Sequence, residues 1–274
     1  MKTIPLALVA VVLLPACARV RTAPGTFPIA ENGQARCCIV ALGAADAPRA
    51  ALAAELQRWL RECTGADIPI ESAAPAMQKA ITLALASEVP EKARRERLWE
   101  VGPEGYVVRS DRDGLWLLAN SELGLQHAVH ALLEQIGYRW FFADPVWTVV
   151  PKRPTLEVSV DLREWPAFGY RRVWYGWGPR SPKLRDDYEA WLRHNRQLGH
   201  FQTDCGHAWE RYIPNSEFQK HPEWFALVKG KREATQLCTS NPEVERRVIE
   251  GAMAAFRKDP KRNMVSVDPN DGGG

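Results

Sequence analysis

Residues 105–152 read GYVVRSDRDGLWLLANSELGLQHAVHALLEQIGYRWFFADPVWTVVPK, and this stretch decides the fold. It begins with two short apolar runs, Tyr106–Val108 and Leu115–Ala119. Between them lies Asp113-Gly114, a pair typical of tight hairpin turns, because such turns need positive φ angles. The stretch therefore opens with a predicted antiparallel hairpin.

A helix is predicted directly after the hairpin. Its apolar residues recur at helical spacing and would face the sheet: Leu125, Ala128, Val129, Leu132, Leu133 and Ile136. Gly137 ends the helix, since glycine takes the left-handed conformation after a helix without steric cost. The chain is then expected to return as a strand over Tyr138–Phe142 and to leave extended along Val149–Lys152.

The chain before the hairpin is expected to add strands to the same sheet. The predicted order is strand, helix, strand and charged helix: Cys37–Leu42, Pro48–Cys63, Ile81–Ala86 and Glu91–Trp99. Residues 29–160 are thus predicted to form a small α/β domain of sandwich-like layers. No reaction centre is expected there. His127 and His130 lie off the apolar face of their helix, so we expect them to be solvated or bonded to neighbours.

After the junction Pro151–Pro166, apolar runs alternate with helical patterns. The expected elements are strands at Phe168–Trp174, Gly199–Thr203 and Met264–Val267, helices at Asp186–Leu198 and Ser240–Phe256, and a long loop over Asp204–Thr239. Such alternation is typical of a (β/α)8 (TIM) barrel, which takes ~250 residues. Residues 161–274 could hold only about three of the eight units. We therefore expect the N-terminal part of a barrel, truncated from a longer protein.

The first residues predict export. Ile4–Leu14 is an apolar run too short to span a bilayer, and a lysine precedes it. Leu14-Pro15-Ala16-Cys17 then resembles the bacterial lipoprotein signal. The resemblance implies that residues 1–17 are a signal peptide, that Cys17 carries the lipid and that residues 18–28 form a tether. The alternative is an ordinary secretory signal in which Cys17 has no role. The lipid on Cys17 is the one expected link to a membrane, in the periplasm or at the cell surface.

Composition argues against several classes of function. The formal net charge of +3 is not concentrated in runs, which argues against a nucleic-acid partner. The other five cysteines permit bonds from Cys37 or Cys38 to Cys63 and from Cys205 to Cys238, although spacing alone establishes neither. No C-x-x-C pair occurs, so a structural zinc site has no support, and no cofactor is expected.

Tryptophan is abundant, with eleven residues in the chain, and two roles are open to these rings, packing and binding. Trp191, inside a predicted helix, is expected in the core. Four others lie among Gly, Pro and charged residues: Trp174, Trp177, Trp209 and Trp224. Their flat rings could equally pack in the core or stack on sugar rings, whose axial C–H groups form an apolar surface.

In a barrel, the reacting groups lie at the carboxyl ends of the strands. Three clusters follow the predicted strands: Arg171, Arg172 and Trp174; Cys205–Trp209; and Asp268–Asp271. Asp271 is the candidate catalytic residue, as a general acid, a base or a ligand for sugar hydroxyls. Glycoside hydrolysis usually needs two carboxyl groups ~5–9.5 Å apart, so a second one is expected outside this chain. Alternatively, Asp268 and Asn270 only shape a Gly-rich turn.

The candidate substrate-binding residues are His207, Arg232, Arg171, Asn195, Trp174, Trp209 and Asn270. His207 could contact a sugar hydroxyl or only bond to the backbone. The arginines could hold a uronic-acid carboxylate bidentately or be surface charges. A metal ion held by Cys205, His207 and His221 is a disfavoured alternative, and no metal is expected.

Several short pieces carry a family resemblance: Glu62–Ala66, Gly105–Arg109, Gly137–Phe141, Val150–Lys152, His194–Arg196, Gly206-His207, His221–Leu227, Gly230–Arg232, Leu237–Pro242 and Pro269–Asp271. They look like a family of exported proteins from polysaccharide-degrading bacteria with a domain of unknown function. That domain is similar to the α-glucuronidases and the β-hexosaminidase-like glycosidases, which place a small α/β domain before a catalytic (β/α)8 barrel. The resemblance covers nearly all of residues 35–274. Family members usually continue into the remaining barrel, which this sequence lacks.

Two functions of different class follow. The first is an exported glycoside hydrolase that acts on plant or microbial polysaccharide fragments, with uronic acid or amino sugar glycosides as substrates. On this hypothesis the chain is the N-terminal portion and is itself nearly inactive. The second is a surface lipoprotein that captures glycans by tryptophan stacking without catalysis.

Overall fold

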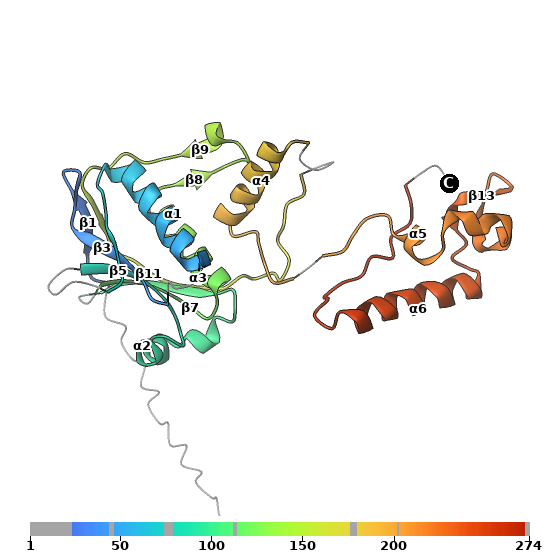
Figure 1. Ribbon diagram of the computed structural model, residues 1–274, viewed down its shortest axis with the longest axis horizontal. Helices are drawn as coiled ribbons and strands as arrows, with labels where there is room; N and C mark the ends of the chain where they lie inside the picture. The colour runs from blue at the N-terminus through green and yellow to red at the C-terminus, as the bar shows by residue number, and fades with distance from the viewer. Residues whose placement is uncertain are drawn as a thin grey trace, which may run out of the picture.

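The computed structural model describes residues 24–43, 47–73, 79–111, 114–175, 180–201 and 203–271. The expected signal peptide, Cys17 and the first part of the tether lie outside these residues. A six-stranded mixed sheet forms the centre of the N-terminal part, in the order β11-β6-β7-β5-β3-β4 (Figure 1). Its strands are β3 (Cys37–Ala41), β4 (Ile70–Glu71), β5 (Lys79–Leu85), β6 (Tyr106–Asp111), β7 (Gly114–Ala119) and β11 (Asp161–Glu164).

The predicted hairpin is confirmed. Strands β6 and β7 pair antiparallel, with Tyr106 opposite Ala119 and Asp111 opposite Gly114. Asp113 lies outside the described residues. Strand β5 then pairs in parallel with β7 on one side and with β3 on the other, which are the connections expected of βαβ units. The chain returns later to add β11 antiparallel to β6 at the edge.

Helices cover both faces of this sheet. The larger layer is α1 (Ala47–Thr64) and α3 (Glu122–Ile136), whose apolar residues share one core with strand residues such as Leu117. The opposite face, which includes Leu118, is covered by α2 (Pro90–Arg95) and the short helix η1 (Leu98–Glu100) (Figure 1). Neighbouring residues of β7 thus enter different cores, because successive side chains of a strand point to opposite faces.

The boundaries of α3 agree with the sequence signals. The Ser121 hydroxyl accepts a hydrogen bond from the backbone N–H of Gly124 at 3.1 Å, and Gly137 follows the last turn at φ +116°. The strand predicted over Tyr138–Phe142 is largely wrong. Only β8 (Arg139–Trp140) forms, and it pairs with β9 (Thr148–Val149) in a separate two-stranded sheet. A short helix, η2 (Pro145–Trp147), lies between these two strands.

A second small sheet joins the two ends of the N-terminal part. Strand β1 (Phe27–Glu31) lies between β2 (Gln34–Ala35) and β10 (Leu156–Val158). Phe27 is opposite Val158, so segments more than a hundred residues apart in the chain are neighbours.

The C-terminal part contains two longer helices and a hairpin. These are α4 (Pro182–His194), α6 (Pro242–Lys258) and the pair β12 (Phe225–Val228) and β13 (Lys231–Leu237), with short helices α5 (Trp209–Tyr212), η3 (Asn215–Gln219) and η4 (Pro222–Trp224). The loop predicted over Asp204–Thr239 is therefore wrong. The turn between β12 and β13 is the Lys229-Gly230 pair, in which both residues have positive φ. A Lys-Gly pair is a weaker sequence signal for a hairpin than Asn-Gly, so the hairpin was not predicted.

The strands predicted at Phe168–Trp174, Gly199–Thr203 and Met264–Val267 are wrong for the residues that the structure describes, which form no strand there. A parallel strand is stable only between neighbours, and no barrel is formed in the described ranges. α6 is confirmed, although its cap is Asn241, whose side chain accepts from the N–H of Glu243.

Cys37, Cys38, Cys63, Cys205 and Cys238 are free thiols, so the suggested disulfides are not formed. Cys37 and Cys38 point to opposite faces of β3, where their sulfurs approach the carbonyls of Ile29 and Lys79. Among the described residues, no helix has both the length and the apolar content that a bilayer crossing requires.

Candidate functional site

The segments after two of the predicted strands lie side by side. The N–H of Gly206 donates to Asp268 Oδ2 at 2.9 Å, and the N–H of Ala208 donates to the Asp268 carbonyl at 3.1 Å. Ser266 Oγ adds a 2.7 Å bond to the Gly206 carbonyl. These bonds bring His207, Trp209, Asn270 and Asp271 into one cluster, which we call the loop-end cluster.

His207 and Asp271 form the polar centre of the loop-end cluster. His207 Nε2 lies 3.0 Å from Asp271 Oδ2, and Nδ1 lies 3.0 Å from the Pro269 carbonyl. The Asp271 side chain is 81% exposed, so it can take hydrogen bonds from a ligand. The bond to the Pro269 carbonyl, together with the Asp271 charge, raises the pKa of His207 above its ordinary value. The pair is therefore an imidazolium–carboxylate pair over a wider pH range than a free histidine would allow.

Trp209 and Asn270 hold the loop-end cluster together. Trp209 Nε1 donates to the Val267 carbonyl at 2.9 Å, and Asn270 Nδ2 donates to the Thr235 carbonyl at 2.8 Å. Gln236 donates in turn to the Asn270 carbonyl. The Trp209 and Asn270 donors are thus bonded within the protein. For Asn270 this agrees with the alternative in which it shapes a turn.

Arg232 lies on the hairpin that borders Asn270. Its guanidinium donates to the Phe225 carbonyl across the hairpin, so part of its bonding capacity is used internally. Trp224, in η4 just before this hairpin, is buried. Its ring stacks on His221 with ring centroids 3.8 Å apart, and the Arg247 guanidinium lies 4.4 Å from the ring centroid. Trp224 is therefore a core residue.

Arg171 and Asn195 lie outside the loop-end cluster, in a second group of predicted ligands. Arg171 forms a 2.6 Å ion pair with Glu104 and donates to the carbonyls of Arg196 and Leu198, both at 2.8 Å. Asn195 Nδ2 donates to the Trp140 carbonyl at 3.0 Å. Both side chains line a cavity of about 190 Å³, but their polar atoms tie the α4 region to the N-terminal part. The structure thus gives these two predicted ligands internal partners.

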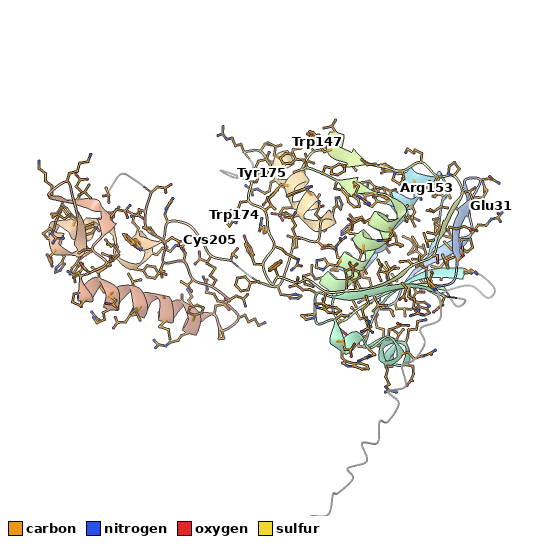
Figure 2. The ribbon with its side chains drawn as sticks, turned by 180° about the vertical axis from the view of Figure 1, so that it is seen from behind. Glu31, Trp147, Arg153, Trp174, Tyr175 and Cys205 are labelled. Carbon is orange, nitrogen blue, oxygen red and sulfur yellow. The ribbon has the colours of Figure 1, made fainter. Side chains whose placement is uncertain are left out.

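Trp174 is the predicted sugar-stacking residue that stays open to solvent. Its side chain is 58% exposed, and it lies on the segment that leads into α4 (Figure 2). Trp177 lies outside the described residues. Trp191 is partly buried, and its Nε1 donates to the Trp140 carbonyl at 3.0 Å, which agrees with the expected core position.

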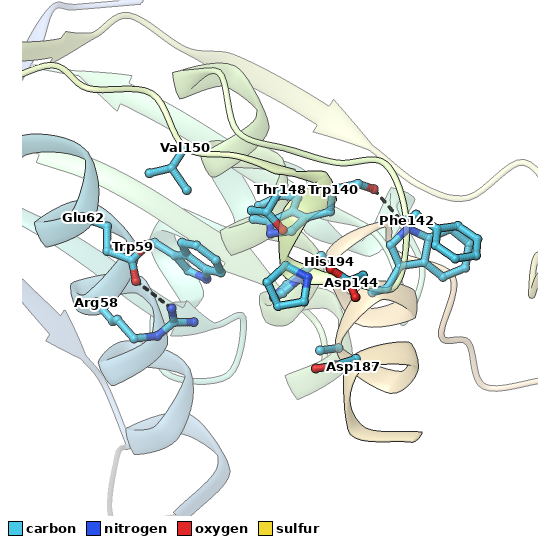
Figure 3. Close-up of a pocket in the computed structure, with 13 residues that line it drawn as sticks. Arg58, Trp59, Glu62, Trp140, Phe142, Asp144, Thr148, Val150, Asp187 and His194 are labelled. Atoms are coloured by element: carbon cyan, nitrogen blue, oxygen red, sulfur yellow. Dashed lines mark hydrogen bonds and ion pairs between the residues drawn. The ribbon is translucent and has the colours of Figure 1, made fainter. Parts of the chain in front are cut away.

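A second cavity, of about 360 Å³, lies between α1, α4 and the β8–β9 segment and was not predicted (Figure 3). Its walls are aromatic and acidic: Trp59, Trp140, Phe142, Trp191, Glu62, Asp144 and Asp187, with Arg58 and His194. His194 stacks on Trp140 with ring centroids 4.5 Å apart. The cavity was not predictable because its walls come from segments more than a hundred residues apart.

We expected the two histidines of α3 to be solvated or bonded to neighbours, and the first alternative is wrong. His127 and His130 are buried, and His130 has no exposed surface. His127 Nδ1 bonds to the Glu104 carbonyl at 2.9 Å, and His130 Nε2 lies 3.4 Å from Glu55 Oε1. Glu55 also lies 3.1 Å from His194 Nε2, so residues of three helices meet at one carboxylate. His127 is not part of this group, so the spacing of the two histidines on α3 was no signal for it.

Residues 142–274 match the family model described as "Domain of unknown function (DUF4838)". No curated protein matches the sequence. The chain is similar to a GH20 β-N-acetylhexosaminidase from Streptomyces coelicolor A3(2), with 23% identity and a TM-score of 0.38 over 54% of this chain and 25% of that chain. It is also similar to a family GH115 4-O-methyl-α-glucuronidase with specificity for decorated arabinogalactans, with 15% identity and a TM-score of 0.43 over 62% and 25%.

A GH20 exo-β-N-acetylglucosaminidase from Vibrio harveyi gives 17% identity and a TM-score of 0.33 over 55% of this chain and 18% of that chain. The chain thus spans a quarter or less of the length of these solved structures. The resemblance to a family with a domain of unknown function is confirmed for residues 142–274.

Proposed function

We propose that the chain supplies a sugar-contacting part of a glycoside hydrolase-like protein, exported and lipid-anchored through Cys17. Its substrates would be polysaccharide fragments that carry uronic acid or amino sugar units. The observation that carries the proposal is the exposed His207–Asp271 pair, held at 3.0 Å where two loops converge. A carboxylate fixed by an imidazole and open to solvent is suited to accept hydrogen bonds from sugar hydroxyls.

Hydrolysis by this chain alone is not expected, because it needs a second carboxyl group beside Asp271. The nearby Asp268 is already used: its Oδ2 accepts from the Gly206 N–H at 2.9 Å and from Ser266 Oγ at 2.8 Å. The hydrogen bond from the Gly206 N–H lowers the pKa of Asp268 most, and the bond from Ser266 lowers it further. The Asp268 carboxylate therefore stays ionised as a structural acceptor. Asp268 is therefore unsuited to act as a general acid.

The alternative function, glycan capture without catalysis, is favoured by exposed aromatic rings outside the loop-end cluster. Trp165 and Trp174 are each 58% exposed. Sugar rings stack on such faces, and no carboxylate partner is required for capture.

Titration calorimetry and a hydrolysis assay on the same glycan panel test both functions. The panel should hold oligosaccharides with glucuronic acid and with N-acetylhexosamine ends. Under the main proposal, Asp271→Asn weakens glycan binding by about 10-fold, the size expected for one charge-assisted hydrogen bond. The matched control Glu233→Gln removes an exposed carboxylate on β13 and should bind as the parent does.

Loss of binding on Trp174→Ala with no effect of Asp271→Asn would favour glycan capture instead. Turnover of any glycoside by the parent chain would contradict the expectation that a second carboxyl group is missing. Absence of binding to every member of the panel would count against both functions.

A further inference from the structure

The strongest unassigned feature is the cluster of Glu55, His130 and His194, which come from α1, α3 and α4. One carboxylate oxygen, Glu55 Oε1, faces both imidazoles, at 3.4 Å from His130 Nε2 and 3.1 Å from His194 Nε2. One nitrogen or oxygen of each residue lies within 4.8 Å of those of the other two. Both histidines are buried, and the Glu55 side chain is 16% exposed.

The spacing of these atoms suits a metal ion. A tetrahedral Zn²⁺ site has bonds of ~2.0–2.1 Å to His and carboxylate ligands, so its ligand atoms lie about 3.3 Å apart. The distances from Glu55 Oε1 to the two Nε2 atoms, 3.4 and 3.1 Å, lie on either side of that value. Two imidazoles and one carboxylate are also a donor set that occurs in zinc sites with three protein ligands and one open position.

The donor atoms already converge without a metal. Both Nε2 atoms face Glu55 Oε1, so a metal ion that replaced these contacts would move the ring protons to Nδ1.

The cavity of Figure 3 gives the cluster a path to solvent. His194 is one of its lining residues, beside Trp59 and Trp140. Two carboxylates, Glu62 and Asp187, also line the cavity, but they are paired with Arg58 and Lys183. An open fourth position on the metal would face this cavity.

Two neighbouring groups bear on the strength of such a site. His130 Nδ1 is buried and has no hydrogen-bond partner among the described residues, and the contact with Glu55 favours a proton on Nε2. Metal binding at Nε2 would place a buried, unpaired N–H at Nδ1, which weakens the site. The guanidinium of Arg193, 3.8 Å from Glu55 Oε2, orients the carboxylate but repels a cation.

We propose that Glu55, His130 and His194 form a Zn²⁺ site with its open position toward the cavity of Figure 3. The inference does not depend on the proposed function, because none of its ligands belongs to the loop-end cluster. Occupancy would tie α4 to α1 and α3.

The test is Zn²⁺ binding by the whole chain, measured by competition with a coloured chelator and by the shift in melting temperature. The partly exposed thiols Cys205 and Cys238 should first be replaced by serine in every variant, since thiolates also bind zinc. Glu55→Gln keeps the side-chain shape and removes the charge. The matched control is Glu62→Gln, which removes a carboxylate from the same helix and the same cavity wall.

We expect one equivalent of Zn²⁺ on the parent and on Glu62→Gln. Glu55→Gln should bind at least ~10–100-fold more weakly, as should His194→Gln, which serves if Glu55→Gln does not fold by circular dichroism. Equal binding by the parent and both ligand variants, or no binding by the parent, would overturn the proposal. The cluster would then be a polar contact that only joins three helices.

Discussion

Arg49 shows how much one buried charge can matter in this protein. Its side chain is 2% exposed and lies between Glu88, at 2.5 Å, and Glu122. It also donates to the carbonyl of Leu42, the first residue after β3. Removal of one partner from such a group leaves buried charges without compensation, which usually costs ~3–5 kcal/mol.

We therefore expect Arg49→Leu to lower the free energy of unfolding by ~3 kcal/mol or more. Urea unfolding followed by tryptophan fluorescence measures this. Arg94→Leu is the control, because Arg94 is 71% exposed and should change stability by less than ~0.5 kcal/mol. Equal effects of the two substitutions would show that Arg49 is not a stabilising centre.

The buried histidines predict a pH dependence of stability. His127, His130 and His194 all have pKa values lowered by burial, so the unfolded chain binds protons at a higher pH than the folded chain. Stability is then full above the ordinary histidine pKa of ~6.5 and is lost as pH falls toward 4. The lowered pKa of Glu55 acts in the same direction at lower pH.

For His130, a pKa of about 4 corresponds to a loss of roughly 3 kcal/mol across this range. Melting temperatures at steps between pH 7 and pH 4, recorded with a chelator present, measure the slope. The variant His130→Gln should show a shallower slope, whereas the surface variant His221→Gln should keep the parent slope. A parent stability that rises on acidification would contradict the prediction.

At the scale of elements, Gly251 on α6 lets a second helix approach closely. A Cβ atom there would lie 2.5 Å from a ring carbon of Tyr212 on α5, and the Tyr212 hydroxyl donates to the Ser266 carbonyl at 2.6 Å. We expect Gly251→Ala to destabilise the C-terminal part by ~1–2 kcal/mol, because overpacking outweighs the better helix propensity of alanine.

Thermal unfolding of the single variants and of Gly251→Ala with Tyr212→Ser tests this expectation. The double variant should lose much less stability than the sum of the single losses, since the smaller side chain removes the clash. Simple additivity would mean that Gly251 and Tyr212 do not interact.

The elements also show which sequence signals suffice. The hairpin β6–β7, the helix α3 and the start of α6 carry local turn and cap residues, and these were predictable. The strands expected at Phe168–Trp174, Gly199–Thr203 and Met264–Val267 had only short apolar runs as support. Such runs form strands only when partners lie on both sides, and a single segment does not encode its partners.

The candidate sites divide in the same way. His207 and Asp271 lie together, as the ends of neighbouring barrel strands would place them, but the strands on which that expectation rested do not form. Glu55, His130 and His194 were not predictable as neighbours, because they lie on three helices and no short spacing links them. Buried polar clusters of this kind depend on helix packing, which the residue pattern of one helix does not specify.

At the scale of the whole molecule, Glu104 joins residues 171–200 to the N-terminal part. It accepts from Arg171 and from the backbone N–H of His200, both at 2.6 Å. Although burial alone would raise its pKa, the bond from His200 and the Arg171 pair lower it, so it is ionised at neutral pH. Loss of this charge should loosen the whole segment.

We expect Glu104→Gln to speed tryptic cleavage within residues 165–201 by ~10-fold, since proteolysis follows the population of the open form. Glu91→Gln is the control, as Glu91 is 77% exposed. Mass spectrometry of the first fragments shows where cleavage occurs. First cleavage elsewhere in Glu104→Gln would contradict the joining role of Glu104.

The pairing of β1 with β10 has a mechanical consequence. Phe27, at the start of β1, is opposite Val158, at the end of β10, and β11 leaves along the outer edge of β6 from Asp161 to Glu164. A pulling force between the two ends of the N-terminal part would therefore load these strands at one end and open their hydrogen bonds one after another. If Cys17 anchors the chain and the C-terminal part holds a polymer, tension would unzip this edge before it sheared the central sheet.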